Sequence, residues 1–378
     1  MKIVLIGPVY PFKGGIAHYT SLLCQALRKN HDVCMVSYKM QYPKLLFKKE
    51  QRDYTNKSFQ VEDTKCWINT ANPFNLIATA RKIKKLKPDA VIIQWWHPYF
   101  APCYYILAKC LRKIPIIITC HNVFPHESFP MDRFLTKLVL RQADGYIVQS
   151  HLDEKDLLQV NSAANYVVTP HPTYNAFKMQ DMSKEEARKV LKVDSYTPML
   201  LFFGFVREYK GLTYLLDALV NVKKQIPAVQ LWVVGDFGDD KDEYLNQIKE
   251  NDLESNVCMV EGYIPDREVE KYFAASDLIV LPYVSATQSG IVQIAYGFEK
   301  PVVVTNVGGL PDVVWDKETG YIVPSQNPKE IAEAIKRFYT EDSNINWQGN
   351  IRAKAAEFSW ETMVVRIEEL IGKSKCTE

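Results

Sequence analysis

Short apolar runs alternate with amphipathic segments along most of the chain. In the first half, apolar runs with the composition of strands occupy 2–6, 32–37, 90–94, 115–119 and 145–149. Segments with the apolar spacing of helices lie between several of these runs. Strands that alternate with helices are typical of a parallel sheet with helices on both faces. The pattern therefore predicts an α/β module in the first half.

The same alternation continues in the second half. Strands are predicted at 199–203, 229–234, 257–260, 278–281, 302–305 and 320–323. Between the two halves, Ser183 and Glu186 have the spacing of a capping box at the start of a short helix. An amphipathic helix is predicted at 360–371. The second half is therefore predicted to be another α/β module.

Length and cysteine usage agree with this picture. The chain has 378 residues, which suits two domains of ordinary size. No apolar run approaches the ~18 residues of a membrane span, and the run at 2–6 is too short for a secretory signal. The eight cysteines lie singly, without a CxxC pair. They predict reduced thiols in a cytoplasmic protein, neither a disulfide framework nor a zinc site.

Charge is distributed unevenly between the modules. Residues 1–175 carry 23 Lys and Arg against 12 Asp and Glu, whereas the remaining residues carry 23 against 32. The basic segments at 42–52, 81–87 and 110–113 are expected to form a face that contacts anionic lipid headgroups. The alternative is three unrelated solvated surfaces. Nucleic acid binding is not expected, because no recognised motif accompanies the charge.

One loop in the second module has the composition of a phosphate site. It follows the strand 278–281, contains Gln288, Ser289 and Gly290, and leads into a helix that starts at Ile291. The first N–H groups of a helix have no intrahelical partner, and the helix dipole is positive there. Gly290 would let the backbone approach a ligand closely. The alternative is an ordinary strand–turn–helix.

A second loop carries two cations. Arg207 and Lys210 follow the strand 199–203, at a place where two positive side chains can hold a diphosphate. The alternative is a solvated turn. Tyr263 follows the strand 257–260 and either lies against a nucleobase or is an exposed turn tyrosine.

The first module offers two candidate positions at strand ends, where ligands bind in open α/β sheets. Gly14 and Gly15 precede the first helix, although the dinucleotide fingerprint GxGxxG is absent. His121 follows the strand 115–119, with His126 as a competitor in the same loop. The alternatives are a glycine turn without a ligand and a structural histidine.

Taken together, these segments resemble the family 4 glycosyltransferases, which have the GT-B fold. The resemblance covers nearly the whole chain and is most specific in FFGFVREYKGL, VVGD, VEGYIP, KPVVVTNVGGLPDVV and ETGYIVP. It implies two Rossmann-like domains with parallel sheets facing across a cleft. These domains are expected at 1–178, on the acceptor side, and at 179–358, where the nucleotide-sugar binds. The helix within 359–378 is expected to return to the first domain.

The resemblance also implies roles for single residues. Arg207 and Lys210 would hold the diphosphate, and the backbone of Gly290 and Ile291 would meet phosphates and sugar. Tyr263 and Ile264 would lie near the base. His121 would contact the donor sugar from the acceptor side, and Gly15, next to Gly14, would lie near the diphosphate. The family generally needs no metal, so Asp240-Lys241-Asp242, which has the DxD pattern, is expected to be a solvated loop and helix start.

Two features depart from the family pattern. The family usually has two glutamates eight residues apart around the phosphate loop, one for the donor sugar and one for the ribose. Here those positions hold Thr287 and Ala295, or Ala286 and Ile294, depending on the register. The polar residues nearest to these positions are Gln288 and Gln293. Together with Ser289, they are expected to bind the donor. The family's arginine usually follows the turn glycine directly, whereas here Phe205 does and Arg207 comes two residues later.

The expected activity is a retaining, metal-independent transfer from a UDP- or GDP-type sugar to a sugar hydroxyl, with no other cofactor. The acceptor is expected to be a glycan or lipid-linked glycan in cell-surface polysaccharide or lipopolysaccharide biosynthesis. The protein is expected in the cytoplasm, peripheral on the inner membrane face. The alternatives are a sugar-nucleotide epimerase of GT-B type and a catalytically inactive donor-binding module. A NAD-dependent dehydrogenase is disfavoured by the missing fingerprint.

Overall fold

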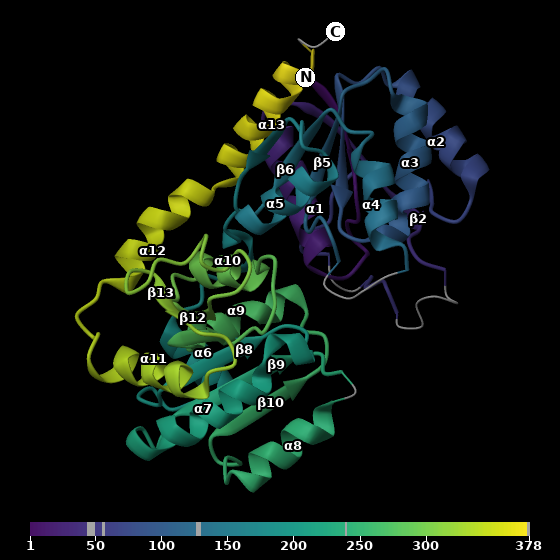
Figure 1. The fold of residues 1–378 in the computed structure, drawn as a ribbon. Coiled ribbons are helices and arrows are strands. Elements are labelled where there is room, and N and C mark those ends of the chain that lie inside the picture. The colour runs from purple at the N-terminus through teal and green to yellow at the C-terminus, as the bar shows by residue number, and fades with distance from the viewer. Residues whose placement is uncertain (44–49, 55–56, 126–129, 239, 376–378) are drawn as a thin grey trace. The chain divides into compact units, whose positions relative to one another are not determined.

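The computed structural model of the chain describes residues 1–43, 50–54, 57–125, 130–238 and 240–375 (Figure 1). The chain divides into two compact units, Met1–Pro170 with Ser359–Glu378, and His171–Phe358. The first boundary falls after Pro170 and not at the expected 178/179. The reason is that residues 171–177 pack on the second unit, where the N–H of Thr173 donates to the carbonyl of Phe358 at 2.9 Å and that of Tyr174 to the carbonyl of Gln293 at 3.2 Å.

A seven-stranded sheet forms the centre of the first unit. Its strands are β1 (Lys2–Ile6), β2 (Asp32–Met40), β3 (Lys65–Asn69), β4 (Ala90–Trp95), β5 (Ile116–Cys120), β6 (Gly145–Val148) and β7 (Tyr166–Val168). They lie in the order β3-β2-β1-β4-β5-β6-β7, and every pair is parallel. The edge strand β3 was not predicted, because its sequence KCWIN is short and partly exposed.

Helices cover both faces of this sheet, as predicted. They are α1 (Gly15–Arg28), α2 (Pro73–Lys85), α3 (Ala101–Leu111), α4 (Asp132–Leu140), α5 (His151–Val160) and α13 (Trp360–Lys375), with a 3-10 turn η1 (Pro98–Phe100). Successive strand residues point to opposite faces. Val4 and Ile6 pack with the apolar residues of α2, α3, α4 and α5, whereas Ile3 and Leu5 pack with those of α1 and α13.

The C-terminal helix α13 is part of the core of the first unit. Ile367, Leu370 and Ile371 are fully buried there. The hydroxyl of Tyr19 on α1 lies 3.7 Å from the sulfur of Met363, and Lys29 forms an ion pair with Glu361 at 2.7 Å. Figure 1 shows α13 running beside β6 and α1.

The second unit has a six-stranded parallel sheet. Its strands are β8 (Met199–Phe203), β9 (Gln230–Gly235), β10 (Val257–Glu261), β11 (Leu278–Leu281), β12 (Val302–Thr305) and β13 (Gly320–Val323), in the order β10-β9-β8-β11-β12-β13. The helices are α6 (Lys184–Leu191), α7 (Leu212–Gln225), α8 (Lys241–Glu250), α9 (Asp266–Ala275), α10 (Gly290–Gly297), α11 (Pro328–Thr340) and α12 (Trp347–Ala355). The 3-10 turns are η2 (Asn175–Phe177), η3 (Glu208–Lys210) and η4 (Ala356–Phe358).

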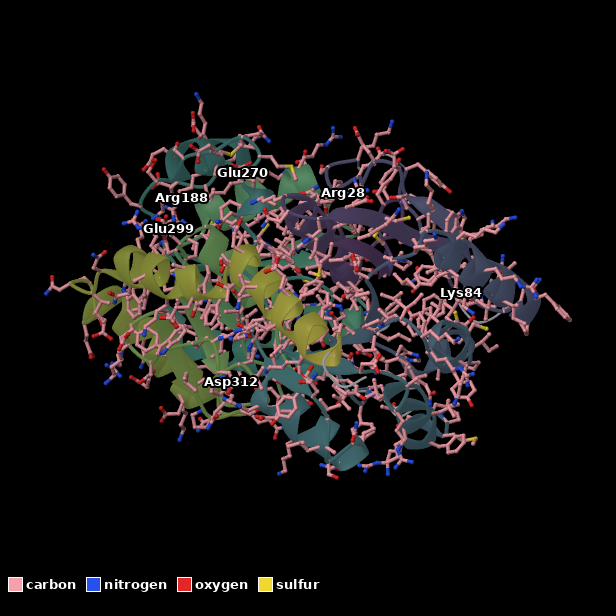
Figure 2. The ribbon with its side chains drawn as sticks, turned by 90° about the horizontal axis from the view of Figure 1, so that it is seen from above. Arg28, Lys84, Arg188, Glu270, Glu299 and Asp312 are labelled. Atoms are coloured by element: carbon pink, nitrogen blue, oxygen red, sulfur yellow. The ribbon has the colours of Figure 1, made fainter. Side chains whose placement is uncertain are left out.

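Two buried charged side chains anchor the start of the second unit, and both are labelled in Figure 2. Glu270 on α9 is 1% exposed and accepts hydrogen bonds from the backbone N–H groups of Met179, Gln180 and Met182 at 2.9, 2.7 and 2.8 Å. Arg188 on α6 donates to both carboxylate oxygens of Asp277 at 3.1 Å. These contacts attach the segment before β8 to α9 and to Asp277, the residue before β11. The capping box of Ser183 and Glu186 at the start of α6 is confirmed.

Both units are therefore Rossmann-like, and the predicted α/β fold class is confirmed. Within the described ranges, no helix combines the length and the apolar character needed to cross a bilayer.

Candidate functional site

The strand order of the second sheet marks a position for ligand binding. The chain runs outward from β8 to β9 and β10, and then returns to the other side of β8 at β11. In parallel α/β sheets, ligands bind beyond the carboxyl ends of the two strands at such a reversal. The loop after β8 spans 204–211, and the loop after β11 spans 282–289. These are the loops that carry Arg207 and Lys210, and Gln288, Ser289 and Gly290.

The two loops are in direct contact. The N–H of Val284 donates to the carbonyl of Tyr209 at 2.7 Å. Gly211 has φ +70°, and a Cβ on it would lie 2.1 Å from the carbonyl oxygen of Pro282. Only glycine fits a left-handed position against another backbone in this way. Gly211 therefore fixes the approach of the first loop to the second.

Lys210 connects the two loops through side chains. Its ammonium donates to the hydroxyl of Tyr283 at 3.3 Å, and that hydroxyl lies 3.4 Å from the hydroxyl oxygen of Ser289. A Cβ on Gly204 would lie 3.6 Å from both the ammonium of Lys210 and the Cδ1 of Ile291. Lys210 thus lies beside the first turn of α10. Among the described residues, Lys210 forms no ion pair with a carboxylate.

The first turn of α10 is held in place by several contacts. Ser289 caps the helix, because its hydroxyl accepts from the N–H of Ile291 at 3.3 Å. A Cβ on Gly290 would find Tyr174 Cε2 nearest, at 3.7 Å. On its other side the loop is held by Gly309, whose N–H donates to the carbonyl of Thr287 at 2.8 Å. The site combines a positive helix end, hydroxyl donors and an ammonium that has no carboxylate partner among the described residues, which suits a phosphate group.

Arg207 does not join Lys210 at this tip in the structure. Its guanidinium donates to the carbonyl of Val206 at 3.0 Å and lies 3.0 Å from the position of a Cβ on Gly238, in the loop after β9. The isolated bridge between Val206 and Phe237 holds these two loops together. The expected pair of cations is therefore split, with Lys210 toward α10 and Arg207 toward the neighbouring loop.

Gln293 is the polar side chain that α10 adds near its first turn. It is 1% exposed, and its Oε1 accepts from the hydroxyl of Thr173 at 3.3 Å. Its Nε2 has no hydrogen-bond partner among the described residues. The second of the two glutamates found in the family would fall farther along the helix, at Ala295 or Ile294. Both are buried apolar residues and cannot replace its carboxylate. Gln288 is half-buried in the loop before the helix.

The remaining candidates of the second unit lie away from this tip. Tyr263 and Ile264 are half-buried in the turn after the edge strand β10, which β9 separates from β8. Asp240 and Asp242 lie at the start of α8, where Lys241 pairs with Glu261. In the part of the chain that the structure describes, no three His, Cys, Asp or Glu side chains are grouped to hold a metal ion.

The strand order of the first unit reverses between β1 and β4. Gly14 and Gly15 lie at the start of α1, just beyond β1, and a Cβ on either would meet no atom within 4 Å. His121 follows β5, and its N–H donates to the carbonyl of Trp95 at the end of β4 at 2.9 Å. The predicted positions in this unit therefore lie at strand ends, while His126 lies outside the described residues.

The surroundings of His121 contain two residues that the sequence did not single out. The Nε2 of His121 is 2.8 Å from the Oε1 of Gln94 in β4, and the Tyr19 ring packs edge-on at 4.6 Å. His121 is 7% exposed and Gln94 is fully buried. Gln94 was missed because it lies inside an apolar strand run, where only the pairing with β5 reveals its neighbour. These contacts fix the orientation of the imidazole.

A second buried histidine, His171, predicts a dependence of stability on pH. Burial lowers the pKa of His171 to about 4, and its Nε2 lies 3.2 Å from the hydroxyl of Tyr174. Below about pH 6.5 the unfolded chain takes up a proton that the folded chain accepts only near pH 4. The free energy of unfolding should therefore fall by about 3 kcal/mol between these pH values.

Urea unfolding of the wild type and His171→Gln at several pH values tests this expectation. The variant should lose the part of the pH slope that His171 causes, with stability retained above about pH 6.5. Equal slopes in both proteins would show that His171 titrates alike in the folded and unfolded chains.

Comparison with known proteins gives the class. Residues 197–341 match the protein family described as "Glycosyl transferases group 1". Residues 14–172 match the family described as "Glycosyl transferase 4-like domain". Together with the two Rossmann-like units, these matches define a glycosyltransferase with the GT-B fold. The chain belongs to the family 4-like glycosyltransferases.

Three similar proteins illustrate the range of relatives. The D-inositol 3-phosphate glycosyltransferase of Corynebacterium aurimucosum is 25% identical over 294 residues, covering 72% of this chain and 69% of the relative. The structure of Anabaena Alr3699/HepE with UDP and glucose has a TM-score of 0.76 at 19% identity, covering 99% and 100% of the two chains. The lipopolysaccharide outer core galactosyltransferase WaaB has a TM-score of 0.70 at 14% identity, covering 99% of each chain.

Proposed function

We propose that this glycosyltransferase moves a sugar from a nucleoside-diphosphate sugar of UDP or GDP type to a sugar hydroxyl, with retention at the anomeric carbon. The observation that carries the proposal is the convergence of Lys210, Tyr283 and Ser289 at the first turn of α10. The similar Alr3699/HepE was solved with UDP and glucose, which supports a diphosphate in such a site. No resident metal or organic cofactor is part of the proposal.

In the proposed reaction, the bond between the anomeric carbon and the diphosphate oxygen breaks, and a bond to the acceptor oxygen forms on the same face. Negative charge builds up on the departing diphosphate. Lys210 and the first N–H groups of α10 stabilise that charge, and each such group typically contributes about 100- to 1000-fold in rate. The departing phosphate oxygen takes the proton of the acceptor hydroxyl.

Three further roles are proposed for residues of the second unit. Arg207 swings from the carbonyl of Val206 to the diphosphate when the donor binds. The buried Nε2 of Gln293 donates to a donor hydroxyl in place of a missing glutamate. The half-buried Tyr263 contacts the base. For the first unit we propose a separate sugar contact through His121, whose ring is held by Gln94.

We further propose that the acceptor is a glycan or lipid-linked glycan in cell-surface polysaccharide or lipopolysaccharide assembly, reached from the cytoplasmic face of the membrane. Two observations support this step. WaaB, to which the chain is similar, is named for the lipopolysaccharide outer core. Residues 1–175 carry 23 Lys and Arg against 12 Asp and Glu, which suits an anionic surface.

Incubating the protein with a panel of UDP-, GDP- and ADP-sugars, with and without glycan acceptors, tests the activity. Transfer to an acceptor, or slow release of free sugar without one, is expected, and anomeric configuration is read from the product by NMR. A new isomer of the sugar nucleotide would identify an epimerase. Tight binding without any turnover across the panel would identify an inactive donor-binding module.

Tyr283→Phe tests the connection between the two loops. The change removes the hydroxyl between Lys210 and Ser289 but keeps the buried ring. A hydrogen bond to a charged group contributes about 1.5–3 kcal/mol, so kcat/KM should fall by about tenfold or more. Because the hydroxyl acts through Lys210, the losses of Tyr283→Phe and Lys210→Ala should not add in the double variant.

The matched control is Tyr196→Phe, since Tyr196 is 93% exposed. It should leave kcat/KM unchanged. Additive losses in the double variant would show that Tyr283 supports the fold without positioning Lys210.

A further inference from the structure

Three helices of the first unit form one continuous layer. Helices α2, α3 and α4 pack side by side in that order, and their apolar residues face the same side of the sheet. Figure 1 shows them together on the side of the sheet away from α1 and α13. The outward surface of this layer is called the α2–α4 face below.

The α2–α4 face is almost purely cationic. Ten exposed cations lie on its helices or at their C-terminal ends: Arg81, Lys82, Lys84, Lys85, Lys109, Arg112, Lys113, Arg133, Lys137 and Arg141. The three helices contain one acidic residue, Asp132, whose carboxylate accepts from the N–H of Arg133. None of these ten cations forms an ion pair within the described ranges. Lys84 is labelled on α2 in Figure 2.

The opposite face of the same sheet is different. There two acidic residues of α13 have cationic partners, because Glu361 pairs with Lys29 and Glu369 with Arg366. The ten cations of α2, α3 and α4 thus lie on the side of the sheet opposite α13. A surface with charges of one sign attracts an extended partner of the opposite sign.

Exposed apolar side chains accompany this charge. Phe74 at the start of α2 is 84% exposed, and Met131 and Phe134 at the start of α4 are 67% and 58% exposed. Phe134 lies on the same helix as the cations Arg133 and Lys137. Large apolar side chains among lysines and arginines suit the boundary between lipid headgroups and acyl chains.

We propose that the α2–α4 face binds an anionic lipid bilayer, with Phe74, Met131 and Phe134 entering the headgroup region. This inference rests on the membrane part of the proposed function and gives it a defined surface. It includes the basic segments at 81–87 and 110–113 and adds α4, which the sequence did not single out. The segment at 42–52 lies largely outside the described residues and is not included.

Vesicle co-sedimentation of the full chain tests the proposal. Wild type should bind vesicles that contain phosphatidylglycerol, bind pure phosphatidylcholine vesicles much more weakly, and be released by high salt. The variant Lys84→Glu/Lys85→Glu/Lys137→Glu should lose at least about tenfold in vesicle affinity. The matched control Lys224→Glu/Lys249→Glu/Lys329→Glu changes three exposed lysines of the second unit and should bind nearly as wild type.

A second variant, Met131→Ser/Phe134→Ser, keeps the charge and tests the apolar contribution. It should also weaken vesicle binding, and it replaces the charge variant if that one does not fold. Both the charge variant and the apolar variant should hydrolyse the donor in solution at the wild-type rate. The membrane proposal is therefore tested independently of the proposed sugar transfer. Absence of salt-sensitive vesicle binding by wild type, equal losses in the control, or stronger binding to RNA than to vesicles would each overturn the proposal.

Discussion

Replacing Lys210 with alanine is expected to lower kcat/KM for sugar transfer by at least ~100-fold while the second unit stays folded. The ammonium lies between the hydroxyl of Tyr283 and the first turn of α10, and it has no carboxylate partner among the described residues. Its removal therefore breaks no ion pair but takes away a positive charge beside the proposed diphosphate. Steady-state kinetics with the preferred donor measures the loss.

The control for this variant is Lys249→Ala, which changes an exposed lysine on α8 and should leave kcat/KM unchanged. Arg207→Ala should also lower transfer, by ~100-fold if its guanidinium reaches the diphosphate during the reaction. Near-normal activity of Arg207→Ala together with a large loss in Lys210→Ala would mean that Arg207 stays beside Gly238, as in the structure. Near-normal activity of both variants would show that the loop carrying Arg207 and Lys210 does not bind the diphosphate.

Replacing Glu270 with alanine is expected to destabilise the second unit by about 3 to 5 kcal/mol. The carboxylate is 1% exposed and accepts three backbone hydrogen bonds from the segment before α6. Alanine leaves those N–H groups without their acceptor and leaves a cavity on α9. Glu270→Gln should be intermediate, because its amide oxygen can still accept from Met179 and Gln180 while the Met182 contact is lost.

Hydrogen exchange of the second unit is the suitable measurement, because a chain with two units need not unfold in one step. Glu268→Ala on the same helix is the control. Glu268 is 42% exposed and pairs with Lys271, so its loss should change stability by less than about 1 kcal/mol. If Glu270→Ala were no more disruptive than Glu268→Ala, the carboxylate would not hold the start of the second unit.

The central strands could be read from the sequence because parallel strands are buried on both faces. Met199–Phe203, Leu278–Leu281 and Val302–Thr305 were predicted with the bounds that the structure shows. Such strands are uninterrupted apolar runs between polar loops. The edge strand β3 lacks this signal, because Lys65 and Cys66 are exposed.

The backbone of the candidate site could also be predicted, but the directions of its side chains could not. The loops after β8 and β11 follow from the strand order, and α10 begins one residue before the predicted Ile291. The separation of Arg207 from Lys210 depends on which loop each long side chain reaches, and that depends on tertiary contacts. Tyr283 was missed because it follows Pro282 at the end of a buried strand, where its hydroxyl has no visible partner in the sequence.

The central claim is that Lys210 and the tip of α10 bind the terminal phosphate of a nucleoside diphosphate. Isothermal titration with UDP, GDP and ADP, each compared with its monophosphate, tests it most directly in wild type and Lys210→Ala. Wild type should bind the preferred diphosphate at least about tenfold more tightly than its monophosphate, and Lys210→Ala should lose most of that difference. The same preference for the diphosphate in both proteins would contradict the account.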